Sequence, residues 1–90
     1  MKKTLELTLY RVWFDQILEG TKKIEYREIK AYWTKRLFNS DGSPKQYDEI
    51  MFTNGYGSDR PKMRVKFLGV REKEGRYEIL LGEILEVLNV

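Results

Sequence analysis

The 90-residue chain contains neither cysteine nor histidine. Without cysteine it has no disulfide framework, no thiolate nucleophile and no cysteine-ligated zinc site. Without histidine it lacks the commonest general base and metal ligand, and its serines have no imidazole to activate them, which excludes a serine hydrolase of the familiar type. The sequence therefore predicts no metal site and no cofactor, and leaves any catalysis to lysine, carboxylate or hydroxyl groups.

Long hydrophobic runs are also missing. No stretch approaches the roughly 18 apolar residues of a membrane helix, and the first residues lack the apolar run of a signal peptide. We therefore expect a soluble cytoplasmic protein without a membrane partner. Because 41% of the residues are hydrophobic and only 2 are proline, a disordered or linker-like chain is excluded. A chain of this length has room for one core, so residues 1–90 are expected to form a single domain.

Alternating apolar residues predict strands over residues 4–10, 47–53 and 62–70, and a closing strand that begins at Tyr77. After Gly82 the apolar phase breaks, and the closing segment fits a bulged strand better than a helix. Residues 22–29 have a strand-like composition without clean apolar alternation. We interpret them as a strand of which one face is not ordinary core.

Two short helices complete the pattern. Residues 30–38 are ambiguous between helix and irregular structure, and we favour a helix. Residues 11–19 predict a helix that ends at Gly20 and carries one apolar stripe, expected in the core and formed by Trp13, Phe14, Ile17 and Leu18. About five strands with two short helices indicate the α+β class and, in so short a chain, a small curved β-barrel that the helices plug.

The net charge of +3 is modest, but it is unevenly distributed. Residues 20–45 hold seven basic and three acidic side chains, and residues 60–71 hold five basic and no acidic ones. On the predicted strand, Lys62, Arg64 and Lys66 form a basic face opposite an apolar one. This face is either solvated, as on an edge strand protected by lysine and arginine, or directed at phosphate groups.

The most unusual segment is residues 20–27, Gly-Thr-Lys-Lys-Ile-Glu-Tyr-Arg. On a strand, Glu25 and Arg27 point to the same side, whereas Lys22 has the wrong parity and joins them only from a turn or a bulge. A carboxylate between two cations suits an anion-binding or base-reading pocket. It also suits a plain surface cluster of ion pairs, which is the interpretation that the spacing alone favours.

This segment resembles the G-x-K-x-x-E-x-R signature of the ASCH domain family, whose fold is related to the PUA domain. The similarity extends to the preceding helix, to the aromatic segment 32–37, to the Asn-Gly-Tyr turn at 54–56 and to the closing strand at 80–84, so that it covers roughly residues 5–86 and is closest in kind to small bacterial and phage members. The resemblance implies a PUA-like β-barrel with a cleft beside the first helix, and a role in RNA binding or RNA metabolism.

The same resemblance implies an enzymatic alternative, because some members are ribonucleases and others hydrolyse N4-acylated cytidine. In an enzyme, Lys22 would be the general acid or base and Glu25 the base or electrostatic stabiliser. The amidohydrolases carry a threonine, proposed as their nucleophile, at the position of Glu25, so the chain departs from them there. Their remaining catalytic carboxylate does not align here, with Glu78 and Glu83 as the nearest candidates.

We therefore predict a domain that binds RNA, a nucleotide or a nucleoside. Cations neutralise phosphate or donate to a base, a carboxylate orients them, and aromatic rings stack on bases. The main alternative for Trp33 is a place in the core, and the alternative for the whole chain is a protein-interaction domain that pairs through the basic strand as an edge. The candidate binding residues are Lys22, Glu25, Arg27, Trp33, Arg36, Asn54 and Tyr56.

Overall fold

A computed structural model describes residues 2–55 and 59–89 of the chain. The elements within these ranges are β1 (Thr4–Leu9), α1 (Arg11–Glu19), β2 (Ile24–Glu28), α2 (Ala31–Leu37), β3 (Glu49–Asn54), β4 (Lys62–Lys73) and β5 (Arg76–Leu88). The strands form one sheet in the order β1-β3-β4-β5-β2, with β1 and β3 parallel and the other pairs antiparallel. The predicted α+β fold of five strands and two short helices is confirmed.

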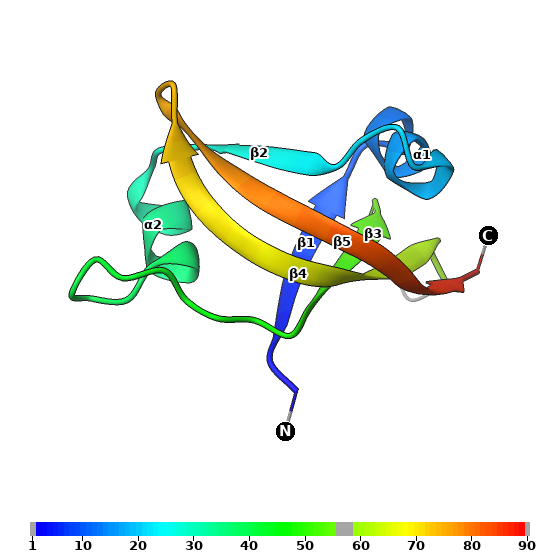
Figure 1. The fold of residues 1–90 in the computed structure, drawn as a ribbon. Coiled ribbons are helices and arrows are strands. Elements are labelled where there is room, and N and C mark those ends of the chain that lie inside the picture. The colour runs from blue at the N-terminus through cyan, green and yellow to red at the C-terminus, as the bar shows by residue number, and fades with distance from the viewer. Residues whose placement is uncertain (1, 56–58, 90) are drawn as a thin grey trace.

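The sheet curls into a half-barrel because its two longest strands bend together (Figure 1). The register of β4 against β5 shifts between Arg64 and Gly69, where the closing strand passes Gly82. A Cβ atom at Gly82 would lie 3.1 Å from the Cβ atom of Lys66, so glycine allows the two strands to approach closely there. The bulged strand predicted beyond Gly82 is confirmed.

The core fills the concave side of the half-barrel. Strand β1 turns alternate leucines inward, and Ile50 and Phe52 point inward from β3, as the alternation predicts. Helix α1 adds Phe14 and Ile17. The buried hydrophobic residues are Leu5, Leu7, Leu9, Phe14, Ile17, Leu37, Ile50, Phe52, Met63, Val65, Phe67, Val70, Tyr77, Ile79 and Leu81.

The prediction that the whole stripe of α1 lies in the core is wrong for Trp13 and Leu18. Both side chains are exposed, while Phe14 and Ile17 between them are buried. Successive residues of a helix lie about 100° apart, so a stripe this wide has flanks that the sheet does not cover. Trp13 is therefore free to face another part of the surface.

Strand β4 lies inside the sheet, between β3 and β5. The interpretation of residues 62–70 as a protected edge strand is therefore wrong, and so is pairing with a partner protein through that edge. Met63, Val65 and Phe67 face the core as predicted, whereas Leu68 is exposed. On the outer face, Arg64 donates to Glu49 at 3.1 Å and to Glu86 at 2.8 Å, and the hydrogen bond to Glu49 raises the pKa of Arg64 above its usual value. Carboxylates thus neutralise the middle of the basic face.

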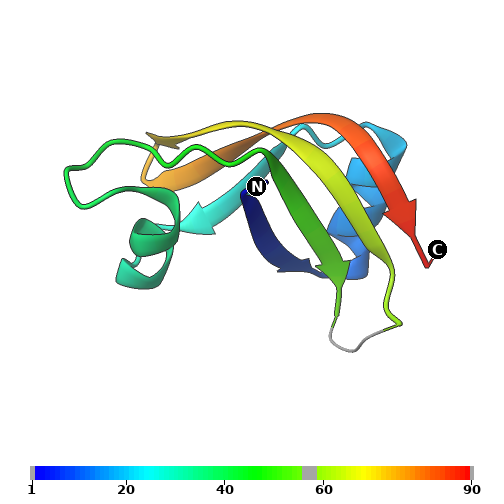
Figure 2. The same ribbon diagram turned by 90° about the horizontal axis from the view of Figure 1, so that it is seen from below.

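The two helices lie at opposite ends of β2 (Figures 1 and 2). Strands β1 and β2 are the two edges of the sheet. This arrangement of strands and helices leaves a gap in the half-barrel between its edge strands, with one helix on either side.

Neither helix in the described ranges has the length and apolar character required to cross a membrane.

Candidate functional site

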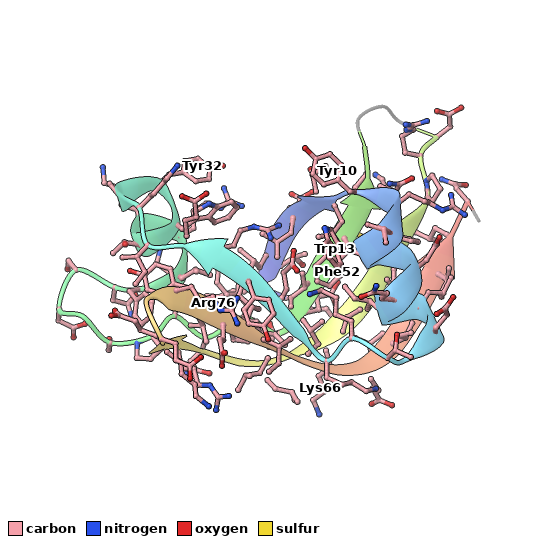
Figure 3. The ribbon with its side chains drawn as sticks, turned by 90° about the horizontal axis from the view of Figure 1, so that it is seen from above. Tyr10, Trp13, Tyr32, Phe52, Lys66 and Arg76 are labelled. Carbon is pink, nitrogen blue, oxygen red and sulfur yellow. The ribbon has the colours of Figure 1, made fainter. Side chains whose placement is uncertain are left out.

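A cleft of about 840 Å³ occupies the gap between the edge strands. Residues 6–9 of β1 and 25–28 of β2 form its walls, and both helices contribute to its rim. Figure 3 shows Trp13 of α1 and Tyr10 on one side, with Tyr32 of α2 on the other. The volume falls in the range of sites that bind small molecules or cofactors.

The end of α1 determines where Lys22 lies. Gly20 adopts a left-handed conformation, with φ of +86°, and its N–H donates to the carbonyl of Ile17 at 3.0 Å. The N–H groups of Thr21 and Lys22 both donate to the carbonyl of Gln16, at 3.0 and 3.1 Å. Glycine is the residue that takes this backbone conformation without strain. The turn keeps Lys22 outside β2, so strand parity does not direct its side chain away from the cleft.

Three charged side chains of the signature meet in the cleft. Glu25 is only 4% exposed. Its Oε1 atom lies 3.3 Å from Nζ of Lys22, and its Oε2 atom accepts a hydrogen bond from Nη1 of Arg27. The side chains of Lys22 and Arg27 are 11% and 16% exposed, so the surface-cluster interpretation does not describe them. A buried carboxylate persists as an ion only when it is paired in this way.

Aromatic rings surround the Lys22 ammonium. Its Nζ atom lies 5.2 Å from the ring centre of Trp13 and 5.0 Å from that of Tyr26. These distances are those of cation–π interactions, which hold an ammonium group in a defined position. At the rim, Tyr10 and Tyr32 are 80% and 62% exposed. The cleft thus combines a fixed cation with uncovered ring faces.

The other predicted residues have different surroundings. Trp33 is half-buried, packs against the core and also lines the cleft. Arg36 lies outside the lining and donates from Nη2 to the carbonyl of Glu6 at 3.1 Å. Asn54 also lies outside it, and its amide donates to the carbonyl of Leu9 at 3.2 Å. Tyr56 falls outside the described residues.

The carboxylates considered for an amidohydrolase lie elsewhere. Glu78 is buried and accepts a hydrogen bond from Arg71 at 2.7 Å, and Glu83 is exposed on β5. Neither lines the cleft. Within residues 2–55 and 59–89, acidic side chains form no group of three or more that could hold a metal ion. Of the carboxylates considered as catalytic groups, Glu25 is therefore the one that lines the cleft, where it pairs with Lys22.

Sequence reasoning missed several cleft residues, among them Tyr10, Trp13, Tyr26 and Arg76. Trp13 was assigned to the core because it belongs to the apolar stripe of α1. The signal that could have separated it is its position at one flank of the stripe, immediately before the buried Phe14. Tyr26 alternates with the charged pair on β2, and its ring reaches the cleft through its contact with Lys22.

Comparison with family models, curated proteins and solved structures finds no match to the chain. The side chains of the cleft themselves indicate what it can bind. They provide an anchored ammonium group, a buried carboxylate that carries its counter-charge, and aromatic rings that are partly open to solvent.

Proposed function

We propose that the chain is an ASCH-type, PUA-like domain that binds an unpaired nucleotide of RNA, or a free nucleotide, in the cleft between β1 and β2. One observation carries the proposal: the ammonium of Lys22 pairs with Glu25 and lies 5.2 and 5.0 Å from the ring centres of Trp13 and Tyr26. An ammonium group has three N–H donors, and Glu25 is its one ion-pair partner among the described residues. The remaining donors suit a phosphate or a base carbonyl.

The aromatic rim supports a single strand as the ligand. Tyr10 and Tyr32 are exposed on opposite sides of the cleft (Figure 3), and rings in such positions stack on bases. In a duplex the base faces are covered by neighbouring base pairs, so stacking of this kind favours unpaired nucleotides. A volume of about 840 Å³ suits one enclosed nucleotide, with neighbouring nucleotides following the rim.

Removal of the cation should weaken binding. We expect Lys22→Ala to raise the Kd for a short labelled single-stranded RNA at least about tenfold, because a hydrogen bond to a charged group contributes roughly 1.5–3 kcal/mol. Fluorescence anisotropy at low and moderate salt measures the Kd, which should rise steeply with salt for the unmodified chain. A duplex of the same sequence should bind more weakly.

Lys66→Ala is the matched control for this experiment. Lys66 is exposed on the convex face of the sheet, away from the cleft (Figure 3), and its substitution removes the same charge. Its Kd should stay within about twofold of the unmodified value, as expected for one distant surface charge. If both variants lost the same affinity for RNA, the loss would reflect net charge alone and would contradict a binding site at Lys22. A Kd that did not change with salt would also contradict the proposal.

A hydrolase acting on RNA or on an acylated cytidine is the second candidate. It is favoured by the distance of 3.3 Å between Lys22 and Glu25, which suits a pair that exchanges protons. Binding remains the better supported function because both oxygens of Glu25 are held by cations. If the chain cleaved labelled RNA or N4-acylated cytidine and Lys22→Ala did not, catalysis would replace binding. Equal turnover by the unmodified chain and by Lys22→Ala would exclude catalysis by this site.

A further inference from the structure

We propose that Arg27 and Arg36 are positioning residues that close the gap in the half-barrel and set the width of the cleft. This role is distinct from the ligand contact that the sequence predicts for both arginines. It concerns the walls of the cleft and can be tested without any ligand.

The first observation concerns the hydrogen bonds that the backbone carbonyl groups of the edge strand β1 accept. An edge strand presents backbone carbonyl groups that need donors. Two carbonyls of β1, at Glu6 and Thr8, accept side-chain hydrogen bonds from arginine: Arg36 Nη2 reaches Glu6 at 3.1 Å, and Arg27 Nη2 reaches Thr8 at 3.3 Å. Carbonyl groups two residues apart on a strand point to the same side. Arginine side chains thus take the place of a neighbouring strand at these two positions.

The second observation is that Arg27 is shared between the two edge strands. Its Nη1 atom donates to the carboxylate of Glu25 and to the carbonyl of Tyr26, the latter at 2.8 Å, while Nη2 donates to Thr8. The guanidinium group therefore joins β2 to β1 across the gap. Three of its five N–H donors are thus used within the protein, and they hold the guanidinium group between the two strands.

The third observation is that Trp33 connects the two arginines. The Cζ atoms of Arg27 and Arg36 lie 5.0 and 5.8 Å from the centre of its ring, within the range of cation–π contacts. Arg36 and Trp33 both belong to α2. Strands β1 and β2 and helix α2 are consequently linked around the gap by two guanidinium groups and one indole.

Lysine cannot reproduce this arrangement. A guanidinium group has a planar fork of five N–H donors, whereas an ammonium group is a point charge that cannot reach acceptors on two strands with the same geometry. Arg27→Lys and Arg36→Lys therefore preserve the charge of the cleft and remove the links. Arg11→Lys is the matched control, because Arg11 pairs with Asp15 on the exposed side of α1 at 3.1 Å and does not line the cleft.

The test uses the full chain in a Trp13→Phe background, in which Trp33 is the single tryptophan. We expect Arg27→Lys and Arg36→Lys to shift the Trp33 emission to the red, to raise its quenching by acrylamide, and to speed amide exchange in residues 4–9 and 24–28 about tenfold. Arg11→Lys should change none of these. Unchanged emission and exchange in folded Arg27→Lys and Arg36→Lys proteins would overturn the inference.

Two further outcomes are also decisive. If one variant does not fold, the other alone carries the same readouts and the same criterion. If neither folds, the arginines support the whole sheet, and the claim that they set the cleft width is overturned. Because these measurements need no RNA, a chain that binds no RNA but shows the expected exchange would contradict the proposed function and leave the positioning role intact.

Discussion

Replacement of Glu25 by alanine is expected to lower the free energy of unfolding by about 3–5 kcal/mol, the cost of removing one partner from a buried ion pair. The carboxylate is 4% exposed and faces two cations, Lys22 and Arg27, whose side chains are themselves mostly buried. Without Glu25, both charges stay in a poorly solvated cleft with no counter-charge from this position. Urea denaturation followed by circular dichroism measures the loss, which is a large share of the roughly 5–15 kcal/mol that stabilises a typical domain.

Glu28→Ala provides the matched comparison on the same strand. Its side chain is 77% exposed and pairs with Lys30 at 3.2 Å. An exposed pair of this kind contributes about 0–1 kcal/mol, so the substitution should change stability little. Similar losses for Glu25→Ala and Glu28→Ala would mean that water screens the Glu25 pair in the same way, and that the cleft does not desolvate its charges.

Local sequence signals predicted the elements of the fold well. The helix over residues 11–19 has the predicted bounds because Gly20 ends it in a left-handed conformation, which sequence identifies directly. The bulge at Gly82 was visible as a break in the apolar phase. Both features depend on residues close together in the chain, and the half-barrel follows from the number of strands in so short a sequence.

Features that depend on distant segments were harder to predict. Alternation assigned the basic and apolar faces of β4, but the sequence did not show that β3 and β5 flank it, because strand order is set by tertiary packing. Likewise, the amide of Asn54 and the guanidinium of Arg36 were suitable groups for a ligand. In the structure both donate to backbone carbonyls of β1, which residue type alone does not reveal.

The convergence of Lys22 with Glu25 and Arg27 lies between these cases. The sequence pattern singled out the three residues. Strand parity allowed them to meet only if Lys22 lay in a turn or a bulge, and the structure places it in a turn. That condition depends on the two backbone N–H groups that bond to the carbonyl of Gln16 beyond Gly20. The position of Lys22 is therefore tied to the end of α1, and we expect it to depend on how that helix is anchored.

Replacement of Phe14 by alanine tests this dependence, and we expect it to lower the free energy of unfolding by about 3–5 kcal/mol. Phe14 is fully buried and anchors α1 in the core together with Ile17. Its loss leaves a cavity under the helix that ends in the turn carrying Lys22. In addition to the loss in urea denaturation, hydrogen exchange should show faster exchange at the amides of Thr21 and Lys22, which bond to the carbonyl of Gln16.

Phe14→Leu distinguishes anchoring from a general loss of stability. Leucine keeps most of the apolar volume, so this variant should cost less than about 1.5 kcal/mol and leave the exchange of the turn amides close to that of the unmodified chain. Faster exchange at Thr21 and Lys22 in Phe14→Ala, greater than the change at amides of β4 and β5, would tie the position of Lys22 to the packing of α1. A uniform increase over the whole chain would contradict that link, because the turn would then be no more dependent on Phe14 than the strands that form the back of the half-barrel.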